Sequence, residues 1–177
     1  LSAARLHYGH GTERPVDDAA ALLAHAMKRQ RMLDAGDHDK PLGAAASRRF
    51  EALVERRIRE RIPVVYLTQR AWFAGLAMHV DERVLVPRSP IAELVESRFS
   101  PWVDAARVRR VLDVGTGSGC IAIACALAFP KARVDAVDIS TGALAVARIN
   151  RRTYGLSRRL KLLESDYFSA LGGARYD

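Results

Sequence analysis

The sequence predicts an α/β fold in which a parallel sheet follows a small helical module. A short apolar run at residues 111–114 is typical of a buried strand, and a glycine-rich loop follows it directly. The loop carries three alternating glycines, Gly115, Gly117 and Gly119. A second apolar run at residues 133–137 ends at an acid, Asp138. A strand, a glycine loop, a helix and a second strand that ends in an acid together predict a site for a nucleoside-containing cofactor.

The spacing of the glycines distinguishes between classes of cofactor. The dinucleotide pattern G-x-G-x-x-G needs a glycine at position 120, where this chain has Cys120. The third glycine comes one residue earlier, and Asp113 stands shortly before the first. This shorter loop resembles the S-adenosylmethionine (SAM) loop of Rossmann-like methyltransferases, in which glycine lets the backbone approach the cofactor closely. The alternative interpretation is a tight strand-to-helix turn that binds no ligand.

Residues 89–177 are predicted to form the N-terminal part of the cofactor domain. After a helix at residues 91–99, strands are expected at 111–114, 133–137 and 160–164, and helices at 118–129 and 141–154. Ser140 is the expected N-cap of the last helix, and Gly155 is its expected C-terminal stop. Tyr176-Asp177 is typical of the opening of a fourth strand. Because a central parallel strand that is unpaired on one side is unfavourable, we expect the functional protein to continue beyond Asp177.

Two segments precede this domain. Residues 1–63 are predicted to form a helical module for substrate recognition, with helices starting at Pro15 and spanning 47–61, and a loop at 34–46. Residues 64–88 are rich in strand-forming side chains, from Val64 to Val86, and are predicted to form a β-hairpin linker with its turn at Ala74-Gly75. Since the first residue is Leu1, not Met, we expect the beginning of the gene product to be missing.

Composition narrows the class of protein. The chain has 177 residues, of which 49% are hydrophobic and 27% charged, and this suits one domain with a smaller attachment. Neither an apolar run of about 18 residues nor a signal peptide is present, so we expect a cytoplasmic protein. Cys120 and Cys125 fall on different faces of a predicted helix and are expected to be buried free thiols. His7 and His10 have no cluster of ligands beside them, so no metal is expected.

The net charge of +8 and the isoelectric point near 10.1 favour polyanionic partners, RNA first among them. The alternative explanation is a general bias of the composition towards arginine and alanine. No basic stretch is interleaved with stacking aromatic side chains, as it is in readers of single-stranded RNA. Direct contact with RNA is therefore expected only as a secondary interaction.

Several motifs together resemble the HemK-type protein glutamine methyltransferases. They are Tyr66-Leu-Thr68, Trp72-Phe73, Val80-Asp-Glu-Arg-Val-Leu-Val-Pro-Arg-Ser-Pro90, Cys120-Ile-Ala-Ile-Ala124, Val137-Asp-Ile-Ser140 and Ser165-Asp166. The resemblance runs from about residue 62 to 177, and more weakly over the helical front. The branch that acts on release factors typically reads Pro-Arg-Pro-Asp-Thr-Glu after the hairpin. This chain reads Pro87-Arg-Ser-Pro-Ile-Ala-Glu93, which is similar to the branch (PrmB-like) that modifies the third protein of the large ribosomal subunit.

The resemblance implies a Rossmann-like SAM-dependent methyltransferase domain, here with strands one to three, and a role for each site residue. Gly115, Gly117 and Gly119 would line the methionine portion of SAM, and Thr116 between them is a further candidate for cofactor binding. Asp113 would lie near the ammonium group of SAM, and Asp138 would accept hydrogen bonds from both ribose hydroxyls. Alternatively, Asp113 and Asp138 are turn or cap residues, and Thr116 serves the start of the helix.

On the adenine side, the resemblance implies that Asp166 accepts a hydrogen bond from the adenine amino group. Ile139 and Tyr167 would flank the ring. Asp166 could instead cap the segment that follows it. Arg88 would help to order a loop over the active site, although an ion pair that ties the hairpin to the domain is an equal alternative.

The implied reaction is SAM-dependent methylation of a glutamine side-chain amide nitrogen on that ribosomal protein, either free or on an assembling particle with RNA. The Asn-Pro-Pro-Tyr motif that holds the glutamine amide in this family follows strand four and is absent from residues 1–177. No catalytic residue is therefore named in this chain, which by itself is expected to bind SAM without transferring the methyl group. The alternatives are a nucleic-acid methyltransferase, a non-catalytic SAM-binding assembly module and, more distantly, a nicotinamide oxidoreductase.

Overall fold

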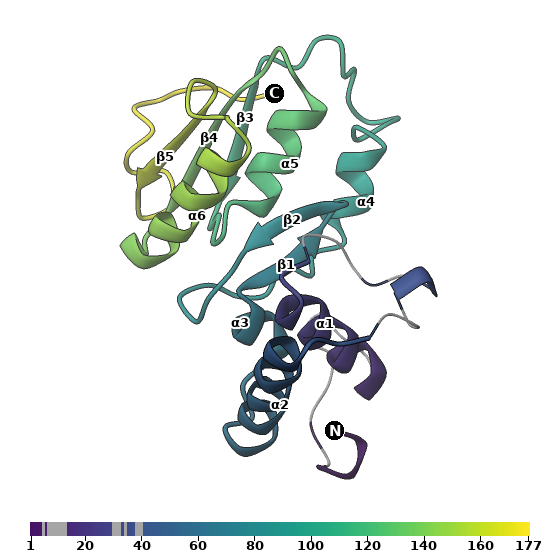
Figure 1. Cartoon of the computed structure of the whole chain (residues 1–177). Helices are drawn as coiled ribbons and strands as arrows, with labels where there is room; N and C mark the ends of the chain where they lie inside the picture. The colour runs from purple at the N-terminus through teal and green to yellow at the C-terminus, as the bar shows by residue number, and fades with distance from the viewer. Residues whose placement is uncertain (5, 7–13, 30–32, 34, 38–40) are drawn as a thin grey trace. The chain divides into compact units, whose positions relative to one another are not determined.

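The computed structural model describes the chain except residues 5, 7–13, 30–32, 34 and 38–40. The chain forms two compact units, Leu1–Gln69 and Arg70–Asp177 (Figure 1). The expected absence of a metal site at His7 and His10 concerns positions outside the described residues. No helix within the described residues is both long and apolar enough to span a bilayer.

The first unit is helical. In chain order it contains the 3-10 turn η1 (Ser2–Ala4), helix α1 (Pro15–Ala26), the 3-10 turn η2 (Ala35–Asp37) and helices α2 (Ala44–Arg59) and α3 (Val64–Thr68). Pro15 occupies the first turn of α1, where its missing N–H costs nothing. The core of this unit is formed by Leu22, Val64 and Leu67, and Phe50, Leu53, Val54 and Ile62 pack against it.

Two predictions about the first 69 residues are wrong. Residues 64–68 were expected to start the hairpin, but they form α3 after Pro63, and Gln69 ends this helix with a φ of +52°. Burial of Val64 and Leu67 in the helical core outweighs the strand preference of β-branched side chains. The predicted loop is also too long, because α2 begins at Ala44.

The hairpin opens the second unit and is shorter than predicted. Strand β1 (Arg70–Phe73) pairs antiparallel with β2 (Leu76–His79). The expected turn at Ala74-Gly75 is confirmed, with φ values of +46° and +71°, as a two-residue hairpin turn of the primed type requires. Residues 80–88 form no strand. Helix α4 (Ile91–Glu96) ends before the predicted Phe99, because Arg98 and Phe99 have positive φ.

The rest of the second unit is a parallel sheet with two helices (Figure 1). The sheet order is β3 (Arg110–Val114), β4 (Arg133–Asp138), β5 (Leu160–Glu164). Helix α5 (Cys120–Ala128) packs on β3 and β4, and α6 (Thr141–Thr153) packs on β4 and β5. The three strands and both helices are confirmed, with α5 starting two residues later than predicted.

The ends of α6 follow the sequence prediction. Ser140 is its N-cap and accepts a hydrogen bond from the backbone N–H of Ala143 at 3.1 Å, and Gly155 follows the helix with a φ of +65°. Residues 174–177 form no strand, where a fourth was expected to open. The backbone N–H of Asp177 nevertheless donates to the carbonyl oxygen of Arg110, at the start of β3.

Candidate functional site

A cleft of about 460 Å³ lies in the second unit, at the carboxyl ends of β3 and β4. One wall is formed by residues 115–118 of the glycine loop (residues 115–119) and the start of α5, together with positions 138, 140 and 143. The other wall consists of residues 83–89, which belong to the segment that leaves the hairpin (residues 80–89, the hairpin exit). This volume falls within the range of about 300–1,000 Å³ that is usual for small-molecule pockets. The carboxyl ends of parallel strands are where open α/β sheets bind ligands.

The glycine loop presents bare backbone to the cleft. Gly115 and Gly117 line it with φ values of +70° and +55°, and a Cβ added at either residue would meet no atom within 4 Å. The backbone conformation therefore selects glycine at these two positions. At Gly119 (φ +79°) an added Cβ would lie only 3.2 Å from the Cβ of Ala147. This third glycine allows close packing of the loop against α6 and is not among the residues that line the cleft.

Asp113 lies beneath the loop and is almost fully buried. Its Oδ2 accepts hydrogen bonds from the Thr116 hydroxyl at 2.7 Å and from the backbone N–H of Ala122 at 3.2 Å. Burial raises the pKa of this carboxyl above its ordinary value, and the two hydrogen bonds oppose that shift. Asp113 thus joins the loop to the first turn of α5, and Thr116, which lines the cleft, is held by it.

Asp138 faces the cleft from the end of β4. Its Oδ2 accepts from the backbone N–H of Gly117 at 2.8 Å, and its Oδ1 accepts from the backbone N–H of Ser140 at 2.9 Å. A carboxylate offers about four acceptor positions, so each oxygen keeps capacity for one more donor. The side chain therefore fixes the loop on one side and the start of α6 on the other, and can still bind a ligand.

The segment after β5 adjoins Asp138, because the backbone N–H of Ser165 donates to the Asp138 carbonyl oxygen at 3.0 Å. Buried Ser165 holds the turn, since its hydroxyl lies 3.0 Å from both the Tyr167 carbonyl oxygen and the Ala170 nitrogen. Asp166 is exposed. Ile139, which follows Asp138, and Tyr167, which follows Asp166, are 69% and 70% exposed. Both therefore present apolar surface to solvent. These three side chains lie outside the residues that line the cleft.

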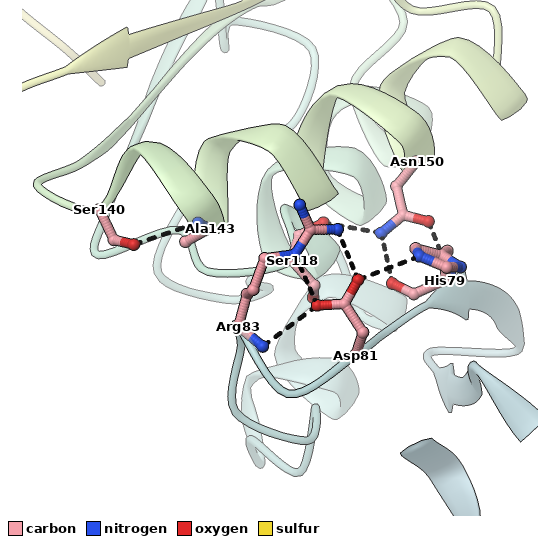
Figure 2. A network of polar contacts seen from close by, with 7 residues as sticks. All are labelled: His79, Asp81, Arg83, Ser118, Ser140, Ala143 and Asn150. Carbon is pink, nitrogen blue, oxygen red and sulfur yellow. Dashed lines mark hydrogen bonds and ion pairs between the residues drawn. The ribbon is translucent and has the colours of Figure 1, made fainter. Parts of the chain in front are cut away.

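The hairpin exit carries an arginine that the site prediction missed. Arg83 lines the cleft, and its guanidinium binds the Asp81 carboxylate through Nε at 2.8 Å and through Nη2 (Figure 2). The hydrogen bonds and charge of Arg83 lower the pKa of Asp81 to about 2. Arg88, predicted as a loop residue, lines the same wall, and Leu85 is 89% exposed. Arg83 stands in the motif that carried the resemblance, but nothing in its spacing marked it as part of a cleft.

The described residues contain no group of three or more histidine, cysteine or acidic side chains that could hold a metal ion. The cleft presents the Asp138 carboxylate and the backbone of a conformationally constrained glycine loop. A carboxylate is an acceptor that suits the hydroxyls and the ammonium group of a nucleoside-linked amino acid.

Comparison with known proteins identifies two domains. Residues 2–68 match the model described as PrmC N-terminal domain, and residues 99–177 match the model described as Methyltransferase small domain. Among solved structures, the C-terminal domain of precorrin-6Y C5,15-methyltransferase from Rhodobacter capsulatus is 24% identical, with 51% of this chain and 46% of that chain covered at a TM-score of 0.42.

Curated relatives align over essentially the whole chain. "Ribosomal protein uL3 glutamine methyltransferase" of Bordetella pertussis is 48% identical, with 100% of this chain and 60% of the relative covered. The proteins of the same name from Burkholderia pseudomallei and Xanthomonas campestris pv. campestris are each 45% identical and cover 97% and 100% of this chain. The chain spans 56% and 57% of their lengths.

The two matched models cover residues 2–68 and 99–177. A methyltransferase domain indicates SAM as the cofactor, in agreement with the spacing of the glycines. The chain is 45–48% identical to curated glutamine methyltransferases over nearly every residue, and both matched models fit the HemK-type family, so its relatives are HemK-type protein glutamine methyltransferases.

Proposed function

We propose that this chain is the SAM-binding portion of an enzyme that methylates a glutamine side-chain amide nitrogen on the large-subunit ribosomal protein uL3. One observation supports the proposal above the others. A carboxylate, Asp138, and the bare backbone of Gly115 and Gly117 face one cleft at the end of a parallel sheet. The motif at 87–93 and the names of the relatives support the choice of substrate.

In this proposal Asp138 binds the ribose hydroxyls, because each of its oxygens has one backbone N–H already in place and room for one more donor. Gly115, Thr116 and Gly117 accommodate the methionine portion. Gly119 supports them by close packing against α6. Asp113 acts from below, where its buried charge holds Thr116 and favours an ammonium group above the loop.

The adenine ring would be held after β4 and β5. Ile139 and Tyr167 offer the two exposed apolar surfaces, and Asp166 offers an acceptor for the amino group. A planar ring buries area on both faces when it enters between such side chains. Removing Tyr167 is therefore expected to weaken SAM more than methionine, which lacks the ring, as competition binding would measure.

SAM supplies an electrophilic methyl group when bound. The glutamine nitrogen is a poor nucleophile, because its lone pair is delocalised into the carbonyl. Catalysis must therefore come from positioning the amide in line with the methyl group, and from hydrogen bonds that strengthen as resonance is lost. In residues 1–177 the glycine loop and Asp138 fix the cofactor side of this geometry. The hairpin exit, with Leu85 and Arg88, forms the facing wall of the cleft. We assign the amide-holding group to the Asn-Pro-Pro-Tyr motif implied by the family resemblance.

The test uses the full-length protein with SAM carrying a trideuterated methyl group and purified uL3. A single labelled methyl on one glutamine peptide, found by fragmentation mass spectrometry, is the expected result. Transfer should be lost when that glutamine is replaced by alanine. Label on RNA that disappears with nuclease, and none on uL3, would overturn the proposal in favour of a nucleic-acid methyltransferase.

The first unit offers a surface for the protein substrate. A groove of about 350 Å³ on α2 is lined by Phe50, Val54 and Ile58, with Glu51, Glu55 and Arg59 at its sides. An apolar floor beside two acids suits an amphipathic segment of a basic ribosomal protein. Ile58→Arg, in the lining of the groove and outside the packed core, should raise the KM for uL3 and leave SAM affinity unchanged. An unchanged KM for uL3 would remove α2 from substrate recognition.

A second groove, of about 660 Å³, supports a contact with RNA in the second unit. Its lining contains one acid, Asp135, and six cations, Arg110, Arg133, Arg151, Arg158, Arg159 and Lys161. Phosphate groups are the partners that such a concentration of arginine favours. Replacing Arg133, Arg158 and Lys161 by glutamine should flatten the salt dependence of binding to ribosomal RNA. An unchanged slope would show that RNA is not held there.

A further inference from the structure

Asn150 is a polar side chain on the buried face of α6, and only 1% of it is exposed. Its carboxamide is fully engaged with backbone from two other segments (Figure 2). The N–H of His79 donates to Asn150 Oδ1 at 2.7 Å, and Asn150 Nδ2 donates to the His79 carbonyl oxygen at 2.9 Å. The second hydrogen of Nδ2 goes to the carbonyl oxygen of Ser118, also at 2.9 Å.

The two bonds to His79 replace those of a neighbouring strand. His79 is the last residue of β2, which pairs with β1 and has no strand on its other side within the described residues. The carboxamide of Asn150 offers one acceptor and one donor, as a strand residue does, and so satisfies both backbone groups of His79. Tyr154, the C-cap residue of α6, also bonds to this edge of β2, because its hydroxyl donates to the Ala77 carbonyl oxygen at 2.9 Å.

The bond to Ser118 has a different consequence. Ser118 lies in the glycine loop, which forms one wall of the cleft, and His79 precedes the hairpin exit, which forms the other. Asn150 is therefore bonded to the backbone of the glycine-loop wall and to the last residue of β2, which leads directly into the hairpin exit. Tyr154 is bonded to the hairpin alone. The side chain of His79 lies 3.4 Å from Asp81, which holds the cleft residue Arg83 in turn (Figure 2).

We propose that Asn150 is a positioning residue for SAM binding, whose carboxamide fixes the separation of the glycine loop and the hairpin exit. This inference rests on the proposed use of the cleft for SAM. Without the carboxamide, one buried and two partly buried backbone groups lose this partner, and the glycine loop and the start of the hairpin exit are no longer tied to one point. The cleft would then sample separations at which Asp138 and the hairpin exit do not reach the cofactor together.

The test compares Asn150→Ala with Tyr154→Phe in the full-length protein. Both variants remove a tie between α6 and β2, but only the first also releases the glycine loop. Asn150→Ala is expected to raise the dissociation constant for SAM by about tenfold, and Tyr154→Phe by less than about twofold. In steady-state transfer, Asn150→Ala should raise the KM for SAM more than it lowers kcat. In the absence of SAM, amide hydrogen exchange should speed up at residues 115–119 in Asn150→Ala only.

Asn150→Ser is the second variant, in case the alanine protein does not fold. Its small hydroxyl leaves room for a water molecule to bridge to His79 and Ser118, so SAM affinity should be partly recovered. Equal SAM affinity in the wild type and in folded Asn150 variants would overturn the inference. So would equal losses in Asn150→Ala and Tyr154→Phe. Failure of the wild-type protein to bind SAM would instead contradict the proposed function.

Discussion

At the scale of single residues, Asp138 has two tasks, since it holds the loop and the start of α6 while facing the cleft. Asp138→Asn keeps the size of the side chain but removes its charge and one of its two acceptor oxygens. We expect SAM affinity to fall by about tenfold or more, as titration calorimetry would measure.

Asp135 on the same strand provides the matched control. Its Oδ2 accepts from Arg110 at 3.0 Å and from the Tyr176 hydroxyl at 2.9 Å, away from the cleft. Asp135→Asn should leave SAM affinity unchanged. Equal losses in the two variants would mean that general charge, and not the placement of Asp138, determines binding.

Replacement by alanine is expected to destabilise the chain to different extents at Gly115 and at Gly119. Alanine at Gly115 meets only an unfavourable φ, whereas at Gly119 it meets both that and the Cβ of Ala147 at 3.2 Å. Gly119→Ala should therefore lower the free energy of unfolding by about 1–3 kcal/mol more than Gly115→Ala. Urea unfolding of the two variants measures this difference. A larger loss at Gly115 would contradict the packing role of Gly119.

Both cysteines should react slowly with thiol reagents in the folded chain. Burial raises the pKa of Cys120 to about 11 and that of Cys125 to about 12. Because the thiolate is the reactive form, the labelling rate should rise about tenfold per pH unit between pH 7 and 10. Urea-unfolded chain, with ordinary thiol pKa values, is the control and should label rapidly at pH 8. Rapid labelling of folded chain at that pH would contradict the burial of these side chains.

At the scale of elements, α1 and α2 are joined by a buried ion pair. Arg57 Nε lies 2.8 Å from Asp18 Oδ2, and both side chains are almost fully buried. Arg57→Ala leaves a buried carboxylate without this partner and should cost about 3–5 kcal/mol in unfolding free energy. Arg56→Ala removes an exposed pair with Glu60 on the same helix and should cost less than about 0.5 kcal/mol.

Urea unfolding of the full chain, followed by hydrogen exchange in α1 and α2, distinguishes these two losses. Equal small losses would indicate that the interface between the two helices is held by its apolar side chains alone.

The elements that the sequence predicted correctly are those with a local cause. The strands of the parallel sheet are apolar runs, and Ser140 and Gly155 mark the ends of α6 by capping and by positive φ. The turn at Ala74-Gly75 has a similarly local cause. Helix α3 was mistaken for strand because only tertiary contacts of Val64 and Leu67 decide its conformation.

The sequence predicted only part of the candidate site. The spacing of the glycines and Asp138 identified one wall of the cleft from local sequence. The other wall, with Arg83, depends on how the hairpin exit folds back, and no spacing rule reports that. The sequence contains one indication that Asn150 is buried, because it lies seven residues after Ala143, on the apolar face of α6. A polar side chain at such a position must find partners, and here they are the backbone of the glycine loop at Ser118 and of His79, just before the hairpin exit.

At the scale of the whole molecule, the chain has a net charge of +8, and the proposed substrate, uL3, is itself expected to be basic. Under the proposed function, long-range attraction between them is therefore weak, and we propose that two local surfaces replace it. The apolar groove on α2 suits the protein substrate, and the cationic groove beside β5 suits RNA of an assembling particle. On this account, salt should weaken association with RNA-containing particles far more than association with free uL3.

The central claim is that the cleft binds SAM, and calorimetric titration of the chain with SAM, and separately with NADH, tests it most directly. The account predicts saturable 1:1 binding of SAM and no binding of NADH, because Cys120 stands where a dinucleotide loop needs glycine. Saturable binding of NADH, with no heat from SAM, would contradict the assignment and indicate a nicotinamide-dependent protein.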